Sequence, residues 1–236
     1  MEKIKMMKWP DIMHLLTDIR SILMLMCMFW VMPGQAREYV ADKDYFELPD
    51  TVTGVPDVLS YFSFNCPHCY YFEMKSNINN FIVASLPNGT TFERYHASRI
   101  GASGRDLTRA WAVAVFLHKQ TEMTPILFRA MQQSHSVQSE TDLQKLFIDQ
   151  GISVDKIKTL WNSTEITASV NRQDRLAEQL GLRFVPAFFV RGKYLVNNMA
   201  LDISTDESFE KDYAGVIQYL LNKKPAVAGN ASGAHP

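Results

Sequence analysis

The chain has 236 residues, 47% of them hydrophobic, and a formal net charge of −1 at pH 7. A chain of this length and composition can bury a full core, and it predicts one domain or one domain with an insertion. No run of five or more Lys or Arg occurs, so the sequence offers no basic patch for a phosphate backbone. We therefore expect no nucleic-acid partner and no membrane-surface role.

The first 36 residues have the pattern of a secretory signal peptide. Arg20 precedes the apolar run of residues 22–32, and Gly34-Gln35-Ala36 then places small residues at the two positions that a signal peptidase reads. The run is too short to anchor a helix across a bilayer. We therefore predict cleavage after Ala36, and the long polar segment before the run leaves translation from an internal Met as an alternative.

The three cysteines divide between this leader and the rest of the chain. Cys27 lies in the apolar run, where a lipid anchor would require a small residue before it, and Met26 is not small. Removal of the leader leaves Cys66 and Cys69, an even count that fits an oxidising compartment and one redox pair. It also leaves a net charge of −2, because the leader holds four of the 24 basic and three of the 25 acidic residues.

The first half of the remaining chain predicts a strand–helix–strand unit. Residues 44–48 alternate as in a short edge strand, and residues 58–64 are β-rich with few charges, as in a strand buried on both faces. Asn65 is the predicted N-cap of a helix over residues 66–86, and residues 91–96 form the next strand. The two cysteines then lie at the carboxyl end of a strand, where ligand and catalytic groups collect in open α/β sheets.

Residues 101–181 show helical spacing without a strand pattern, which predicts an all-helical insertion. Ser139 and Asp142 form a capping box at the start of one helix, and further helices are predicted over residues 153–161 and 165–180. We assign the methionine and aromatic side chains of this segment to core packing and not to chemistry.

Strand patterns return in residues 185–190 and 194–196, which predict a hairpin with Gly192 in its loop. A last amphipathic helix is expected over residues 206–221. Residues 225–236 are small and polar, and they predict a disordered tail.

The motif Cys66-Pro67-His68-Cys69 places two thiols one turn apart at the start of a helix. The helix N-terminus offers unpaired N–H groups and partial positive charge beside the first sulfur, which favours the Cys66 thiolate. Pro67 suits an early helical position, and His68 can add positive charge. Because the thiolate attacks or departs in disulfide exchange, a pKa of Cys66 below the reference value of about 8.5 makes it reactive.

A zinc site is an alternative interpretation of the two cysteines, but it needs two further ligands. No second Cys pair occurs, and His96, His118 and His135 are scattered singly, so we predict no metal. A purely structural disulfide is a weaker alternative, because a four-residue loop removes little chain entropy. Pro186 begins a strand, and considered alone it would be trans, because about 5–6% of X-Pro bonds in folded proteins are cis.

Together these motifs resemble the DsbA-type thiol:disulfide oxidoreductases of the bacterial periplasm. Cys-Pro-His-Cys follows an aromatic strand, a helical insertion comes next, and Val-Pro-Ala-Phe-Phe-Val resumes the sheet. The resemblance spans residues 38–221, and it includes Leu-Thr-Arg-Ala-Trp-Ala-Val-Ala at residues 107–114, Trp-Asn-Ser at residues 161–163 and Gly-Lys-Tyr at residues 192–194.

The resemblance implies an α/β thioredoxin fold with an inserted all-helical domain. Residues 37–100 and 182–224 would form the thioredoxin-like domain, and residues 101–181 the insertion. It also implies a cis bond before Pro186, facing the cysteines, with the backbone of Val185 available to pair with a bound polypeptide in strand fashion. A valine at that position is similar to the oxidase pattern and unlike the isomerase pattern.

The implied mechanism is disulfide donation. A client thiolate attacks the Cys66 sulfur, and a second client thiol displaces Cys66 as a thiolate, with Cys69 as the resolving thiol. The resemblance implies reduced or unfolded secreted polypeptides as clients, and a DsbB-type quinone-linked membrane oxidase that restores the disulfide. We expect a periplasmic monomer without a cofactor.

The chain departs from the family pattern beside the cysteines. Family members commonly carry a buried glutamate six residues before the first cysteine, where this chain has Ser60, and Arg94 stands where a lysine is usual. Glu73, a supporting residue in the family, does match. The hypothesis is that loss of the carboxylate alters proton handling at Cys69 while the exchange chemistry survives.

Other functions remain open at this point. One is an oxidase of narrow specificity that serves a few clients. Another is a disulfide isomerase, although the short region before Val55 cannot supply the dimerisation domain that isomerases normally carry. From a different class, the chain could bind polypeptides without turnover, or bind a metal.

Overall fold

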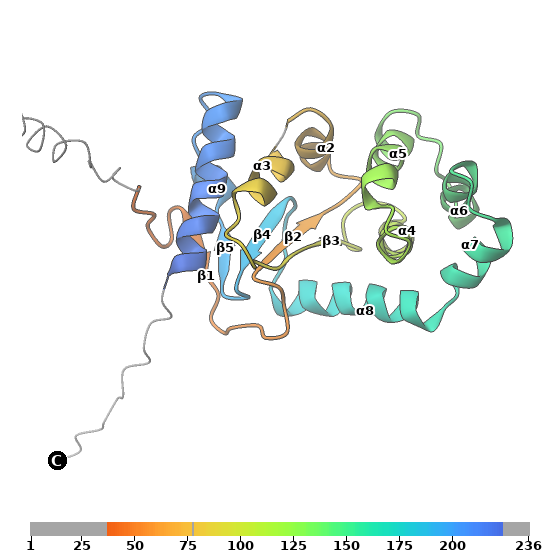
Figure 1. Cartoon of the computed structure of the whole chain (residues 1–236), viewed down its shortest axis with the longest axis horizontal. Helices are drawn as coiled ribbons and strands as arrows, with labels where there is room; N and C mark the ends of the chain where they lie inside the picture. Colours follow the sequence, from red (N-terminus) through yellow and green to blue (C-terminus); the bar gives the residue numbers. More distant parts are fainter. Residues whose placement is uncertain (1–36, 77, 224–236) are drawn as a thin grey trace, which may run out of the picture. The chain divides into compact units, whose positions relative to one another are not determined.

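A computed structural model describes residues 37–76 and 78–223, so the predicted signal peptide of residues 1–36 and the predicted tail of residues 225–236 lie outside the described residues. Within them, a five-stranded sheet packs against helices, and the chain between β3 and β4 forms consecutive helices (Figure 1). This is the α/β architecture with a helical insertion that the sequence predicts.

The strand that precedes the cysteines is an interior strand of the sheet. The strands are β1 (Tyr45–Glu47), β2 (Val58–Phe62), β3 (Phe92–His96), β4 (Ala187–Val190) and β5 (Tyr194–Val196). Their spatial order is β1-β5-β4-β2-β3, with β2 parallel to β3 and antiparallel to β4. All five residues of β2 are buried, and β1 lies at an edge, so both predictions about these strands are confirmed.

Two helices connect β2 to β3, where the sequence predicts one. They are α2 (Pro67–Met74) and α3 (Ile78–Ser85). After α2 the amide of Ser76 bonds to the carbonyl of Tyr71, five residues back, at 2.9 Å. This bond departs from the regular four-residue spacing of an α-helix. The prediction of one continuous helix over residues 66–86 is therefore wrong.

Asn65 is not the N-cap of α2, which corrects a second prediction. Cys66 takes that position, with φ −92° and ψ 120°. The Asn65 side chain instead donates to the two carbonyls on either side of Gly101, at 3.0 and 2.9 Å. Gly101 permits this approach, because its φ is +77° and a Cβ there would lie 2.6 Å from the Asn65 side chain.

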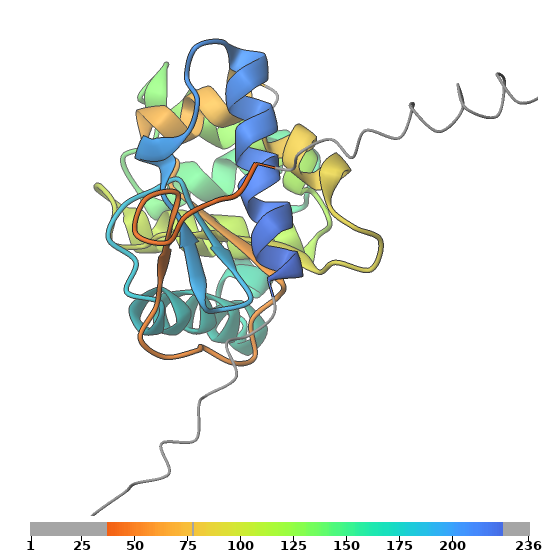
Figure 2. The ribbon, with the colours of Figure 1, turned by 90° about the vertical axis from the view of Figure 1, so that its left-hand side faces the viewer.

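The two faces of the sheet pack against different helices. Side chains alternate along a strand, so Phe188 and Val190 of β4 pack in one core with α9 (Asp206–Asn222), whereas Ala187 and Phe189 pack with the C-terminal part of α8 (Thr164–Gln179). In both views the sheet lies between α9 and α8 (Figure 1 and Figure 2).

The inserted helices enclose a further core. They are α4 (Gly104–Phe116), α5 (Gln120–Gln132), α6 (Glu140–Asp149), α7 (Val154–Trp161) and α8. The predicted capping box of Ser139 and Asp142 begins α6. Phe62 and Phe64, at the end of β2 and just beyond it, pack in the same core as Trp111 of α4. The insertion therefore contacts the segment that leads to the cysteines.

Candidate active site

The loop after β2 places Cys66 and Cys69 at the start of α2. Pro67 occupies the first helical position, where its missing N–H leaves no hydrogen bond unmade. Both cysteines are thiols here, and Cys66 is 8% exposed whereas Cys69 is 1% exposed. The Cys66 sulfur accepts a hydrogen bond from the Cys69 amide at 3.4 Å, and the Cys66 thiol donates to the Val185 carbonyl at 3.4 Å.

The two sulfurs have opposite electrostatic environments. A hydrogen bond from the Cys69 thiol lowers the pKa of Cys66 to about 6, with help from the amides of Cys69 and His68 and from the nearby charge of His68, while burial opposes the shift. Burial raises the pKa of Cys69 far above the ordinary range, and the Cys66 sulfur adds to the shift. The pair therefore separates into an acidic outer thiol and an inner thiol that keeps its proton.

The loop before β4 faces the cysteines. The Val185–Pro186 bond is cis, as the resemblance implies. The Pro186 carbonyl accepts a hydrogen bond from Nδ2 of Asn198 at 2.7 Å, and Oδ1 of Asn198 accepts one from the buried Tyr213 hydroxyl at 2.6 Å. Asn198 and Tyr213 thus hold this loop in place, although neither is predicted from the sequence as a residue of the site.

A largely buried ion pair lies near the inner thiol, because the charge of one of its members, Arg94, acts on Cys69. Glu73 of α2 and Arg94 of β3 form it, with side chains 12% and 18% exposed, and Asn79 donates a further hydrogen bond to Glu73. The Arg94 guanidinium carbon lies 4.6 Å from the centre of the Phe62 ring. Burial raises the pKa of Glu73, and Arg94 opposes that shift. The structure thus pairs Glu73, an expected supporting residue, with Arg94, which also lies opposite Ser60 in the sheet register.

An apolar cavity of about 650 Å³ opens beside Cys66 and the proline loop. Its floor and rim come from α2, from the loops on both sides of the hairpin and from the start of α9. Met199 and Ile203 are 93% and 81% exposed, which is unusual for side chains of their kind. The cavity is lined by Phe46, His68, Phe72, Phe184, Val185, Pro186, Asn197, Asn198, Met199, Ile203 and Phe209.

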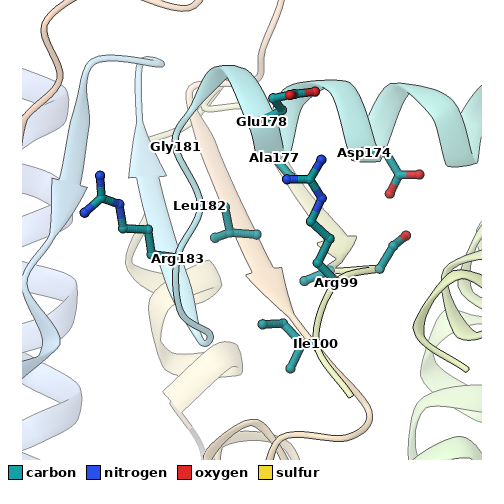
Figure 3. A pocket seen from close by; sticks show the side chains of 10 residues that line it. Arg99, Ile100, Asp174, Ala177, Glu178, Gly181, Leu182 and Arg183 are labelled. Atoms are coloured by element: carbon teal, nitrogen blue, oxygen red, sulfur yellow. The ribbon is translucent and has the colours of Figure 1, made fainter. Parts of the chain in front are cut away.

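A second cavity, of about 200 Å³, lies between the C-terminal part of α8 and the loop after β3 (Figure 3). Its side chains carry charges of both signs, among them Arg99, Arg183 and Glu178, and Asp174 pairs with Arg105 of α4. Val185, whose carbonyl contacts the Cys66 sulfur, lines the larger cavity and not this one, so we place the redox chemistry beside the larger cavity.

Residues 37–76 and 78–223 contain neither a cluster of metal ligands nor a helix that could span a membrane. There, no three or more His, Cys, Asp or Glu side chains gather in a way that could hold a metal ion. No helix in that part of the chain has the length and apolar content needed to cross a bilayer.

Comparison with known proteins gives three close similarities. Residues 57–208 match the model of the DSBA-like thioredoxin domain. The chain is 40% identical over 191 residues to the thiol:disulfide interchange protein DsbA of Pectobacterium carotovorum, which covers 81% of this chain and 92% of that protein. It is 38% identical over 192 residues to DsbA of Escherichia coli K12, with the same coverage of 81% and 92%.

Solved structures give the same result. The crystal structure of the disulfide oxidoreductase DsbA from Proteus mirabilis matches with a TM-score of 0.76 and 32% identity, covering 79% of this chain and 98% of that one. The fold and the facing thiols and proline therefore define a thioredoxin-fold thiol:disulfide oxidoreductase. Because the family model covers more than half of the chain, and relatives of similar length exceed 30% identity, the chain belongs to the DSBA-like thioredoxin domain family.

Proposed function

We propose that this enzyme donates disulfides to reduced polypeptides secreted into the bacterial periplasm, with Cys66 and Cys69 as its redox pair. The observation that carries the proposal is the contrast between the two sulfurs. The pKa of Cys66 is lowered to about 6, whereas burial raises that of Cys69. A stabilised Cys66 thiolate favours the dithiol over the disulfide, which makes the disulfide a strong oxidant.

The exchange transfers two electrons from the client to the enzyme. A client thiolate attacks the Cys66 sulfur of the oxidised pair, the bond between Cys66 and Cys69 breaks, and Cys69 leaves and takes a proton. A second client thiolate then attacks the client sulfur of the mixed disulfide, and Cys66 leaves as a thiolate. The client gains one disulfide and loses two protons, of which one stays on Cys69 and one goes to solvent.

Val185 and Pro186 are the proposed client-binding residues. A client cysteine joined to the Cys66 sulfur would lie beside the Val185 carbonyl, which already contacts that sulfur at 3.4 Å. An extended client segment can use such a backbone for strand-like pairing. The apolar cavity next to it suits an uncharged client side chain. A structure of the Proteus mirabilis relative contains a non-covalently bound peptide, PWATCDS, which includes a cysteine.

Continued turnover requires an oxidant for the reduced pair. We assign this role to a quinone-linked membrane oxidase of the DsbB type, which would accept two electrons for each client disulfide. The exchange steps would run in reverse with this partner: the Cys66 thiolate attacks a disulfide of the partner, and Cys69 then loses its proton and attacks the Cys66 sulfur, which restores the enzyme disulfide and leaves the partner as a dithiol. We also assign supporting roles to Pro67 and His68, at the start of α2, and to Glu73, which follows Cys69 by about one helical turn and pairs with Arg94.

The redox equilibrium with glutathione tests the direction of transfer. We expect a midpoint potential more oxidising than about −200 mV, the value near which an oxidising secretory compartment is poised. A potential near or below about −270 mV, typical of a reductant, would contradict the proposal. A reduced peptide with two cysteines, incubated with the oxidised enzyme, should become oxidised in the same experiment, whereas a polypeptide-binding module would leave it reduced.

A further inference from the structure

Side chains from other parts of the fold hold the loop that carries Cys66. The amide of Phe64 donates a hydrogen bond to Nε2 of His96 at 3.1 Å. The carbonyl oxygens of Phe64 and Cys66 both accept hydrogen bonds from Nε2 of Gln132, at 2.8 and 3.0 Å. Gln132 is the last residue of α5, so the helical insertion directly contacts the backbone of the first cysteine.

His96 can accept this bond only as a neutral ring with its proton on Nδ1. Because the Phe64 amide is a donor, Nε2 must be an acceptor. Nδ1 then donates to the hydroxyl of Thr108 in α4 at 2.8 Å, and that hydroxyl donates to the Gly104 carbonyl at 3.0 Å. His96 is fully buried, and burial lowers its pKa to about 3, so the ring stays neutral where thiols exchange.

The partners of Gln132 fix the orientation of its amide in the same way. Both are carbonyl oxygens, and only the NH₂ group of the side chain can donate to them. The Cys66 carbonyl also accepts the first hydrogen bond of α2, from the Tyr70 amide at 3.0 Å. Gln132 therefore contacts the residue at which the helix begins.

These contacts constrain the conformation on which the Cys66 thiolate depends. Cys66 has the extended backbone of an N-cap, and in this conformation its sulfur reaches the Cys69 amide. A change in the ψ angle of Cys66 would turn its carbonyl away from Gln132. The same rotation would change the direction from which the helix N–H groups approach the sulfur.

We propose that Gln132 and His96 are positioning residues that hold the backbone of residues 64–66, so that the Cys66 sulfur stays against the amide groups at the start of α2. The inference rests on the proposed function, since it concerns the same redox pair. If so, α5 of the helical insertion influences the reactivity of Cys66, which lies outside the insertion.

The test is a titration of the Cys66 thiolate in Gln132→Met, which removes the donor group at nearly constant side-chain length. Both hydrogen bonds of Gln132 are lost, and we expect the pKa of Cys66 to rise by about half a unit to one unit and the equilibrium constant for reduction by glutathione to fall about threefold to tenfold, an effect of the size that one hydrogen bond contributes. Gln133→Met is the matched control, because the neighbouring Gln133 donates to the Tyr70 hydroxyl instead, and it should change neither quantity.

A second variant covers the case in which Gln132→Met does not fold. Thr108→Val keeps the shape of Thr108 but removes the hydroxyl that orients His96, and it should raise the pKa of Cys66 in the same direction. A purely structural role predicts a lower free energy of unfolding with an unchanged Cys66 pKa, and that result would overturn the inference. If the unmodified enzyme failed to oxidise a dithiol peptide, the proposed function itself would fail, which is a different outcome.

Discussion

The carbonyl oxygen of Val185 accepts a hydrogen bond from the Cys66 thiol at 3.4 Å, although the two residues are 119 positions apart in the chain. The sheet register explains the contact. β2 and β4 are antiparallel, with Tyr61 opposite Ala187, so the end of β2 lies beside the start of β4. The cysteine follows one strand and the valine precedes the other. We therefore expect a client bonded to the Cys66 sulfur to lie beside the Val185 backbone.

Cys66→Ala and Cys69→Ala should fail at different steps. Cys66→Ala removes the more exposed sulfur of the pair, so we expect no oxidation of a reduced client peptide and no mixed disulfide. Cys69→Ala removes the resolving thiol, so a disulfide between Cys66 and a client should accumulate. Non-reducing electrophoresis with a client that contains one disulfide distinguishes the two variants. Client oxidation that survives Cys66→Ala would show that another group carries the activity.

The equilibrium with glutathione should change its pH dependence near pH 6. The pKa of Cys66 is lowered to about 6, from about 8.5 for an ordinary thiol. Ionisation of Cys66 therefore stabilises the reduced, folded protein in full at a pH above about 8.5, the pKa of an ordinary thiol. This stabilisation is lost as the pH falls through about 6, the pKa of Cys66.

Above about pH 6, reduction of the enzyme disulfide by glutathione releases one proton, because Cys66 is produced as a thiolate. The equilibrium constant should then rise about tenfold per pH unit between about pH 6 and pH 8.5, and stay constant below about pH 6. Measurement of the reduced fraction in glutathione buffers across this range checks the prediction. If the equilibrium constant for reduction by glutathione did not change between about pH 6 and pH 8.5, Cys66 would titrate as an ordinary thiol.

The sequence predicted the chemical groups of the site better than the groups that support them. The spacing of Cys66 and Cys69 and a strand ending just before them are local features, and these predictions agree with the structure. His96, Gln132 and Asn198 could not be predicted in the same way. Their hydrogen bonds join them to backbone atoms 32, 68 and 12 positions away, and a backbone partner leaves no trace in the residue types.

The errors in local structure have a similar origin. The apolar spacing of residues 66–86 continues through the break between α2 and α3, so periodicity alone predicts one helix. Asn65 is a common N-cap residue type, but its side chain finds backbone carbonyls beside Gly101 in the folded chain. Cys66 then supplies the cap, which is also the contact that helps to stabilise its thiolate.

Arg94→Leu should destabilise the protein by about 3 kcal/mol at neutral pH, because it leaves the largely buried Glu73 carboxylate without its charged partner and with only the Asn79 amide as a donor. Burial already raises the pKa of Glu73, and loss of Arg94 should raise it further. A raised pKa in the folded state means that the loss is smallest in acid and grows as the pH rises through that pKa.

Urea unfolding in acid and at neutral pH measures this difference. Arg105→Leu is the control, since the Arg105–Asp174 pair has side chains 54% and 30% exposed, and a surface pair contributes about 1 kcal/mol or less. Equal losses for the two variants, or a loss for Arg94→Leu that does not depend on pH, would contradict the buried-pair interpretation.

Tyr213→Phe should loosen the proline loop without changing the redox pair. The variant keeps the ring that packs against Phe188 but removes the hydroxyl that orients Asn198. We expect the free energy of unfolding to fall by about 1 kcal/mol, as for loss of one buried hydrogen bond, and the KM for a client peptide to rise. The pKa of Cys66 should not change. Tyr71→Phe is the control, because the Tyr71 hydroxyl bonds to Asp206 in an exposed position.

Ser60→Glu tests how the missing carboxylate affects the pair. Ser60 is buried and lies opposite Arg94 in the parallel register of β2 and β3. Among the described residues, Nε of Arg94 has no hydrogen-bond partner, so a carboxylate at position 60 would have a donor close by. A buried negative charge near a thiol disfavours its ionisation to a thiolate. We therefore expect the rate of exchange in Ser60→Glu to reach its plateau at higher pH than in the unmodified enzyme.

Ser60→Gln separates the effect of charge from the effect of size. It introduces a side chain of nearly the same volume as glutamate without the ionisable group, so its pH profile should match that of the unmodified enzyme even if its stability is lower. Rates of exchange with a dithiol peptide, measured across pH for the three proteins, give the comparison. Identical profiles for Ser60→Glu and Ser60→Gln would show that a carboxylate at this position has no influence on proton transfer at Cys69, and the hypothesis would then be rejected.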